Sequence, residues 1–231
     1  MAIKRYLGGL AALFFPPVCA GCRAPLVDGE TAICASCWYH LPYTGFHKMP
    51  DNNCARQLWG RVPVRGVTAY LWFHKFSRVQ ELIHQLKYRN RPDIGILLGE
   101  RYGEILRHVA PYNSADCIVP VPLHAVKLKR RGYNQSACFA HGLARSMQKP
   151  VIEDGLRQVR TVSSQTRKGR YQRYENVRGT IEVVDRSRLS GKHTLLVDDV
   201  LTTGATVEAC ADALLADPSV SVSIATLARA V

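Results

Sequence analysis

The stretch from Leu195 to Thr206, which reads LLVDDVLTTGAT, decides how this chain is expected to fold. The residues from His193 to Val197 carry no charge apart from any protonation of the histidine, which is typical of a strand buried on both faces. A helical pattern follows from Ala205 to Leu215. Strand, turn and helix in this order predict an α/β protein with an open sheet, whose ligands bind beyond the carboxyl ends of the strands.

Two adjacent carboxylates, Asp198 and Asp199, stand where this strand ends. They can accept hydrogen bonds from a vicinal diol such as that of a ribose, and a hydrogen bond to a charged group contributes about 1.5–3 kcal/mol. The turn that follows can wrap an anion, because Gly204 allows close backbone approach and a helix N-terminus favours phosphate. The predicted ligand-binding residues of this turn are Thr202, Thr203, Gly204, Ala205 and Thr206.

Two other interpretations of the turn compete with this one. An acidic pair can hold magnesium, as in response regulators, but magnesium binding does not explain why the TTGAT segment follows the pair. A purely structural turn does not account for two adjacent carboxylates. The whole pattern of 12 residues resembles the phosphoribosyl pyrophosphate signature of type I phosphoribosyltransferases. The resemblance implies their fold, a parallel sheet flanked by helices, with Asp198 and Asp199 as catalytic residues.

The remaining patterns predict the neighbours of this strand. Further strands are expected at 67–73, 116–123, 180–184 and 220–227, the last closing the sheet, and helices at 79–86, 94–109, 135–147 and 205–215. This alternation favours a parallel sheet. Lys87 and Arg89 are expected at a helix C-terminus, where the helix dipole favours cations; a role near the ligand pocket is the alternative. A basic loop is expected at 127–131.

Four cysteines near the N-terminus form two CxxC pairs separated by 11 residues: Cys19 and Cys22, then Cys34 and Cys37. This spacing is typical of a zinc ribbon or knuckle. The segment is too short to bury a core of its own, so metal binding would supply its folding free energy, about 10–16 kcal/mol for structural zinc in small peptides. Four thiolates close the coordination sphere, so the predicted Zn²⁺ is structural.

Two other roles of the cysteines compete with zinc binding. Two disulfides need an oxidising compartment, and a redox motif needs only one CxxC pair. Cys54 is a candidate for an extra or alternative ligand, although it has no CxxC partner. The other three, Cys117, Cys138 and Cys210, lie among apolar residues and are expected to be buried thiols.

The predicted organisation has two parts, an N-terminal module at 1–60 and a main domain at 61–231. The module begins with an apolar stretch at 6–15 that predicts a short docked helix; a secretory signal is the alternative, but no small-residue cleavage site follows it. The stretch 48–53 has the composition of a linker or exposed loop. Residues 156–180 are polar with little periodicity and are expected to form a mobile lid.

Charge and hydropathy narrow the class of protein. The net charge is +13, and residues 120–192 hold 16 Lys and Arg against 5 Asp and Glu. Such a basic concentration attracts phosphate groups, in a small metabolite or a nucleic acid; solvated surface charge is the alternative. Hydrophobic residues make up 47% of the chain, and no apolar run reaches the roughly 18 residues of a membrane helix. We therefore expect a soluble, cytoplasmic protein without a transmembrane segment.

Three segments follow the CxxC pairs in a fixed order: VPVPLHAVKLKRRGYNQ at 119–135, TVSSQTRKGRYQRYENVRG at 161–179, and the acidic turn. Together they resemble the ComF/GntX family of competence-associated bacterial proteins, over nearly the whole chain. The resemblance implies a phosphoribosyltransferase domain with an N-terminal zinc module. It also implies a link to natural transformation or to the use of external DNA.

The resemblance assigns further ligand-binding residues by position. The loop that meets pyrophosphate is Val121, Pro122, Leu123 and His124, supported by Arg130, Arg131, Asn134 and Gln135. The lid residues are Thr161, Gln165, Arg173 and Asn176. The sequence departs from the family at Lys168-Gly169, where an apolar residue is expected, and this departure leaves the lid contacts open.

The implied reaction is transfer of a phosphoribosyl group from phosphoribosyl pyrophosphate. Mg²⁺ would bridge the pyrophosphate and the ribose oxygens, and basic residues of the 120–131 loop and the lid would add charge stabilisation. A nitrogenous base would then attack C1′. No motif in the sequence identifies that base.

Two non-catalytic functions remain alternatives. The first is an adapter that senses phosphoribosyl pyrophosphate and holds single-stranded DNA or a competence helicase, with Tyr171 and Tyr174 stacking on bases beside Arg170 and Arg173. The second is a transcriptional regulator on the same fold, although no helix-turn-helix pattern is evident. Assembly into a homo-oligomer is compatible with either.

Overall fold

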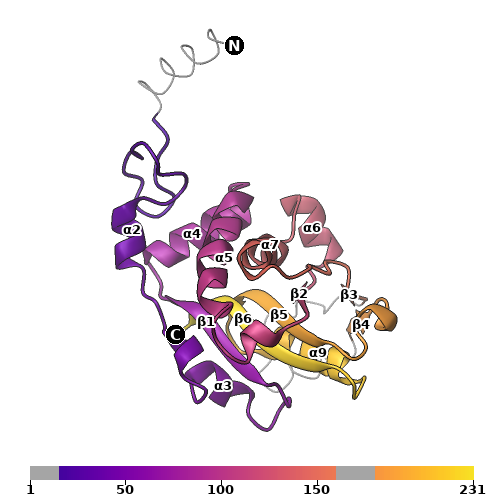
Figure 1. Cartoon of the computed structure of the whole chain (residues 1–231). Coiled ribbons are helices and arrows are strands. Elements are labelled where there is room, and N and C mark those ends of the chain that lie inside the picture. Colours follow the sequence, from indigo (N-terminus) through magenta and orange to yellow (C-terminus); the bar gives the residue numbers. More distant parts are fainter. Residues whose placement is uncertain (1–15, 160–179) are drawn as a thin grey trace.

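Among the described residues, the main sheet runs in the order β1-β6-β5-β2, and all of its pairings are parallel (Figure 1). Its strands are β1 (Gly66–Phe73), β2 (Cys117–Pro120), β5 (His193–Leu201) and β6 (Ser221–Ala230). The computed structural model describes residues 16–159 and 180–231. The expectations for 6–15 and 160–179 fall outside this part. The α/β class with a parallel sheet is confirmed.

The position of β6 corrects the expectation that residues 220–227 close the sheet. β6 lies between β1 and β5, with Ile224 paired to Val67 on one side and Leu196 on the other. Its residues from Val222 to Ala228 are all buried, so no polar face alternates with an apolar one. The last strand of the chain is therefore an interior strand, and β1 and β2 form the edges.

Helices cover both faces of the sheet (Figure 1). One face carries α4 (Arg78–Tyr88), α5 (Pro92–Leu106) and α7 (Gln135–Met147), and the other carries α3 (Asn53–Leu58) and α9 (Ala205–Leu215). Each layer holds its own cluster of buried apolar side chains. The helices predicted at 79–86, 94–109, 135–147 and 205–215 are confirmed.

The helices α5 and α7 touch backbone to backbone. A Cβ added to Gly142 would collide with the carbonyl oxygen of Ile96, and one added to Gly99 would collide with that of Phe139. Close approach at both points requires a residue without a side chain. This contact fixes the position of α7, whose first turn lies at the candidate site.

The expected basic loop at 127–131 is a helix, α6 (Ala125–Arg131). His124 caps its N-terminus by accepting a hydrogen bond from the Val126 N–H, and Gly132 ends it in the left-handed conformation. None of its residues is buried. A helix without a buried face has no apolar periodicity, so the sequence pattern could not predict it.

The beginning of the expected lid is also ordered. Residues Leu156–Gln158 form β3, which pairs antiparallel with β4 (Ile181–Val183) in a separate two-stranded sheet. The strand predicted at 180–184 is thus confirmed. The expectation of a mobile segment from residue 156 is wrong at its start, because Leu156 packs into the core.

The stretch 48–53, expected to be a linker or loop, is attached to the core. Asn52 is buried; its side chain caps α3 and donates hydrogen bonds to the carbonyl oxygens of Met49 and Val67. A linker is therefore excluded there, whereas the alternative of an exposed loop agrees with the exposure of residues 48–51 and 53. The division between two parts at residue 60 stays a prediction. The helix α3 precedes this point, yet its Leu58 packs in the core beneath the sheet.

Short elements complete the fold. The N-terminal segment contains α2 (Ala35–His40) and the 3₁₀ turn η1 (Phe46–Lys48), and further 3₁₀ turns are η2 (Tyr112–Ser114) and η3 (Arg186–Arg188). Both sheet edges are covered: Thr44 and Pro42 hydrogen-bond to β1, and Pro150 and Ile152 bond to β2. Covered edges protect a sheet from pairing with other chains. No helix in the described residues is long and apolar enough to cross a membrane.

Candidate functional site

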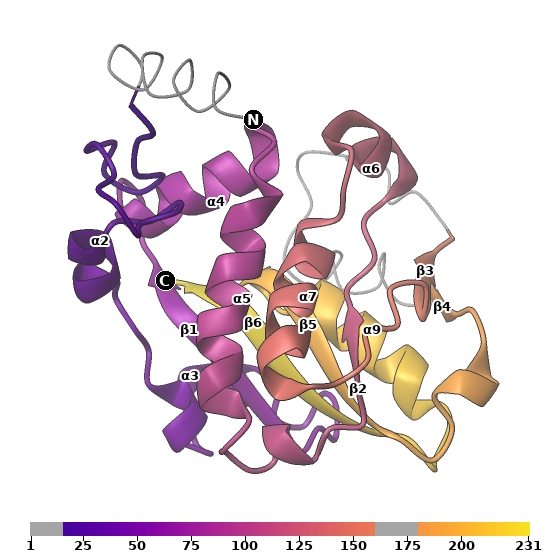
Figure 2. The same ribbon diagram turned by 45° about the horizontal axis from the view of Figure 1, so that its top comes forward.

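The acidic turn and the segment predicted to bind pyrophosphate lie at the carboxyl ends of β5 and β2, beside α6 and the first turn of α7 (Figure 2). β5 supplies the acidic pair, and the turn after it leads into α9. β2 leads through residues 121–124 into α6. This is the edge at which ligands of open α/β sheets bind.

The carboxylate of Asp198 is held by two hydrogen bonds. Its Oδ1 accepts from the Ser136 hydroxyl at 2.9 Å and from the Asp199 N–H at 2.8 Å. Ser136 lies in the first turn of α7, whose N-cap is Asn134. Sequence analysis did not single out Ser136, because nothing local to it signals that α7 would reach β5.

Asp199 has a cationic partner. The Lys87 Nζ lies 2.9 Å from Asp199 Oδ2, an ion pair by distance but without the alignment of a hydrogen bond. The Asp199 side chain is only 8% exposed and the Lys87 side chain 22%. Lys87 was expected at a helix C-terminus, which is confirmed, and its contact with Asp199 also places it at the site, as the alternative interpretation proposed.

Asp198 binds a proton more tightly than an ordinary aspartate does. Burial and the adjacent Asp199 carboxylate raise the pKa of Asp198 to about 7, against the hydrogen bonds from Asp199 N–H and Ser136 and the charge of Lys87, which lower it. Two close carboxylates in a site of low dielectric resist double ionisation. A ligand that donates hydrogen bonds, or a cation, would stabilise the fully ionised pair.

The turn after β5 has the geometry of an anion cradle. Gly204 is the N-cap of α9 with φ +81°, and it has no side chain to cap the first N–H groups of the helix. Thr202 and Thr206 are exposed, so their hydroxyls are accessible. Free N–H groups at a helix N-terminus favour a phosphate.

The outer side of this turn is held by residues that sequence analysis missed. Gln57 Nε2 donates to the Thr202 carbonyl at 2.8 Å, and Arg61 Nη1 donates to the Thr203 carbonyl at 3.4 Å. Arg229 of β6 donates to the Thr202 carbonyl at 3.1 Å. With its carbonyl groups engaged behind it, the turn has its N–H groups available for a ligand.

The residues assigned to pyrophosphate binding separate into two groups. Val121 is buried and donates its N–H to the Val197 carbonyl at 2.8 Å, so this loop is joined to β5. Asn134 donates to the Val121 carbonyl at 2.9 Å. The half-buried Arg131 instead bonds to Gln135 and lies over the Tyr88 ring.

The other assigned residues differ in exposure. Pro122 and Leu123 are half-buried in the loop, whereas Arg130 is exposed on α6. Thr161, Gln165, Arg173 and Asn176, assigned to the lid, lie outside the described residues. The ligand contacts of all these residues stay predictions.

The four CxxC cysteines form a second centre. All four Sγ atoms lie within 4.8 Å of one another, and those of Cys22 and Cys34 are 3.7 Å apart. Tetrahedral Zn²⁺ with Zn–S bonds of about 2.3 Å separates its ligands by about 3.8 Å, so the donor set fits the metal. Backbone N–H groups of Gly21 and Cys34 point at Cys19 Sγ.

The thiolate state is favoured at one of these ligands. Burial would raise the pKa of Cys19, but the N–H groups of Cys34, Cys22 and Gly21 lower it to about 6. Cys54 does not belong to the cluster: it is fully buried beneath the sheet, with Phe46 and Leu58 in its core cluster. The idea that Cys54 is a ligand is therefore wrong. Cys117, Cys138 and Cys210 are buried, as expected.

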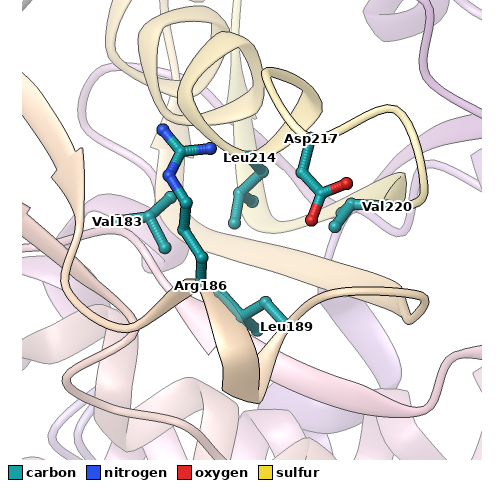
Figure 3. A pocket seen from close by; sticks show the side chains of 6 residues that line it. All are labelled: Val183, Arg186, Leu189, Leu214, Asp217 and Val220. Atoms are coloured by element: carbon teal, nitrogen blue, oxygen red, sulfur yellow. The ribbon is translucent and has the colours of Figure 1, made fainter.

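A small hollow lies away from both centres, at the C-terminal end of α9 (Figure 3). Its lining residues are Val183, Arg186, Leu189, Leu214, Asp217 and Val220. No sequence-predicted site residue is among them. The hollow carries no grouping of catalytic side chains, so the carboxyl edge of the sheet remains the candidate site.

Two known protein families match this chain, one over most of the main domain and one over the segment with the four cysteines. Residues 134–230 match the phosphoribosyl transferase domain, and residues 10–58 match the double zinc ribbon domain. The main domain therefore has the phosphoribosyltransferase fold, and the cluster of four cysteines is a structural zinc site.

Similar proteins cover nearly the same length. The chain is 30% identical over 234 residues to the "DNA utilization protein YhgH" of Escherichia coli K12, covering 94% of this chain and 99% of that protein. It is 25% identical to "Competence protein F" of Haemophilus influenzae, covering 84% and 89%. A solved glutamine phosphoribosylpyrophosphate amidotransferase from B. subtilis is 22% identical, with a TM-score of 0.40, over 62% of this chain and 30% of that one.

Proposed function

The chain belongs to the ComF/GntX family, and from that premise we propose that it binds phosphoribosyl pyrophosphate at the carboxyl edge of its sheet, in a process that uses DNA. One observation carries the proposal. The acidic pair of β5 and the uncapped N-terminus of α9 flank a single turn, so a diol acceptor and a phosphate cradle lie next to each other.

The ribose would bind to the acidic pair. Its O2 and O3 hydroxyls donate to the carboxylates of Asp198 and Asp199, and its 5-phosphate accepts from the turn at 202–206. Ser136 and Lys87 keep the two carboxylates in place. The contacts that hold both carboxylates for the ribose are thus already formed in the protein without a ligand.

The proposed reaction breaks the C1′–O bond, with the electron pair leaving on pyrophosphate. Mg²⁺ bound to the pyrophosphate would neutralise the leaving group. The negative field of Asp198 and Asp199 stabilises positive charge at C1′ as the bond breaks. The C1′–N bond then forms to a nitrogenous base, which loses its proton to solvent.

Ligand-dependent thermal unfolding tests the binding step. Phosphoribosyl pyrophosphate with Mg²⁺, at 100 times its dissociation constant, stabilises a protein by about 2.7 kcal/mol. For a chain of this size we expect a rise of roughly 5–11 °C in Tm. The double variant Asp198→Asn/Asp199→Asn should lose this shift, while the exposed control Asp28→Asn should keep it. Equal shifts in wild type and double variant would exclude this site.

A second candidate function is favoured by α6. Lys127, Lys129 and Arg130 are exposed on a helix with no buried residue, and the Arg131 guanidinium lies 5.6 Å from the centre of the half-exposed Tyr88 ring. Cations beside an aromatic ring suit single-stranded DNA, because its bases stack on aromatic rings and its phosphates pair with cations. The second candidate function is therefore an adapter that holds single-stranded DNA and catalyses no transfer.

Fluorescence anisotropy with a labelled oligothymidylate separates the two functions. DNA binding by α6 should weaken steeply with salt and be lost in Lys127→Glu/Lys129→Glu. The control Arg107→Glu changes an exposed cation on another part of the surface. Release of pyrophosphate on adding a base would instead support the enzyme.

A further inference from the structure

Lys87 differs from most ion-pairing cations of the described residues. In most pairs both side chains are well exposed, as in Arg56 with Asp51 at 59% and 55%. Lys87 is 22% exposed, and its carboxylate partner Asp199 is 8% exposed. Both groups of such an ion pair lose hydrating water. Their attraction offsets this cost only if the two groups are well placed relative to each other.

The end of α4 that carries Lys87 is fixed from two sides. The Tyr133 hydroxyl donates to the Leu86 carbonyl, and the Arg131 guanidinium lies over the Tyr88 ring, so the end of α6 and the residues after it hold this end of α4. On the opposite side Gln85 Nε2 donates to the Ala20 carbonyl of the zinc module at 3.1 Å. Lys87 therefore approaches Asp199 from a backbone that is anchored to both neighbours.

We infer that Lys87 is a positioning residue for the ribose-binding pair, fixing Asp199 Oδ2 and offsetting one of the two negative charges of the site. This inference rests on the proposed function. Its consequence is that a larger share of the pair is doubly ionised at neutral pH and can accept hydrogen bonds from a diol. Without the ammonium, one proton would bind more tightly to the pair, and a protonated carboxyl accepts hydrogen bonds from a diol poorly.

The groups that face the pair come from three elements. Lys87 of α4 contacts Asp199, the Ser136 hydroxyl of α7 donates to Asp198, and Cys210 of α9 is buried close enough for Asp198 to raise its pKa. Of these three, only Lys87 is cationic at neutral pH. Its charge therefore lowers the pKa of Asp198, whereas burial and the Asp199 carboxylate raise that pKa to about 7.

The deciding measurement is the titration of the carboxyl groups without ligand, by ¹³C NMR of aspartate-labelled protein. An opposite charge within about 4–6 Å lowers an aspartate pKa by about 1–3 units, so Lys87→Met should raise the midpoint of the pair by at least about one unit. Lys87→Gln, which keeps a hydrogen-bond donor without the charge, should do the same if Lys87→Met does not fold. Lys87→Arg should leave the midpoint near that of the wild type.

Ligand binding provides the second readout. We expect the affinity for phosphoribosyl pyrophosphate with Mg²⁺ at pH 7 to fall at least about fivefold in Lys87→Met or Lys87→Gln, and to recover as the pH is raised. The control Lys48→Met removes an exposed lysine and should change neither readout.

The two measurements separate failure of this inference from failure of the proposed function. An unchanged titration midpoint in both neutral variants would overturn the role of Lys87, even if the wild type binds the ligand. A wild type that binds no ligand would contradict the proposed function, while the titration would still decide whether Lys87 controls the acidic pair.

Discussion

Gln57 Nε2 donates a 2.8 Å hydrogen bond to the carbonyl oxygen of Thr202, which lies 145 residues later in the chain. The bond joins α3 to the turn after β5. Leu58 packs behind the same turn, since a Cβ on Gly204 would meet Leu58 Cδ2 at 3.1 Å. Arg61, just beyond α3, pairs with the buried Glu208 in the first turn of α9. The segment before β1 thus forms the outer wall of the candidate phosphate cradle.

Removing Arg61 should destabilise the protein strongly. Glu208 is 1% exposed, and a buried charge that loses its partner costs about 3–5 kcal/mol. We expect Arg61→Met to lose about that much free energy of unfolding in urea, and the double variant Arg61→Met/Glu208→Met to recover most of it. As a control, Arg56→Met breaks the exposed pair with Asp51 and should cost at most about 1 kcal/mol. Similar losses in both single variants would contradict the buried-pair argument.

Zinc content should depend on the CxxC cysteines alone. We expect one zinc per chain by metal analysis, and loss of the metal in Cys37→Ser, because a closed site needs all four thiolates. Removing the metal with a chelator should unfold the N-terminal module, since zinc supplies its folding free energy. Cys54→Ser is the matched control and should retain one zinc. Loss of zinc in that control would reinstate Cys54 as a ligand.

Alanine at the crossing of α5 and α7 should be destabilising. In Gly142→Ala the new methyl group meets the Ile96 carbonyl and the Gly99 backbone, and overpacking of this kind typically costs about 1–3 kcal/mol or more. Urea unfolding followed by circular dichroism measures the loss. In the control Gly155→Ala the added Cβ comes no closer than 3.2 Å to any atom outside its neighbours, so a smaller loss is expected. Equal costs would mean that the helices separate easily.

Asp198→Asn should stabilise the protein at alkaline pH. The folded-state pKa of Asp198 is raised to about 7, above the ordinary 3.8, mainly by burial. Its contribution to stability is therefore present at low pH and is lost as the pH rises from about 4 through about 7. Asparagine cannot ionise, yet its side-chain oxygen can still accept from Ser136. The variant should melt above the wild type at pH 8.5 and near it at about pH 4; the opposite trend in Tm would refute the raised pKa.

Local patterns predicted much of the fold. The strand at 193–197 and the helices at 135–147 and 205–215 were confirmed because their signals are short-range: apolar spacing along the chain and the residues that begin or end an element. The zinc ligands were predicted for the same reason, since each CxxC pair binds one side of the metal. The acidic pair and its turn also form one contiguous stretch.

The failures arose where long-range packing decides the outcome. The place of β6 inside the sheet depends on its neighbours, β1 and β5, which no local pattern specifies. The start of the expected lid became a strand because Leu156 finds a core and β3 finds β4. α6 gave no signal because it buries none of its side chains.

The sequence by itself determined the fold class, the zinc ligands and the position of the acidic turn, because each depends on residues that are close together in the chain. Only the tertiary structure decided which groups complete the site. Lys87, Ser136, Gln57 and Arg61 reach it from three separate segments, α4, α7 and the segment before β1, and their contacts exist only after folding has removed water from Asp199 and Glu208. A buried charge requires a partner, but that requirement does not specify which distant residue will supply it.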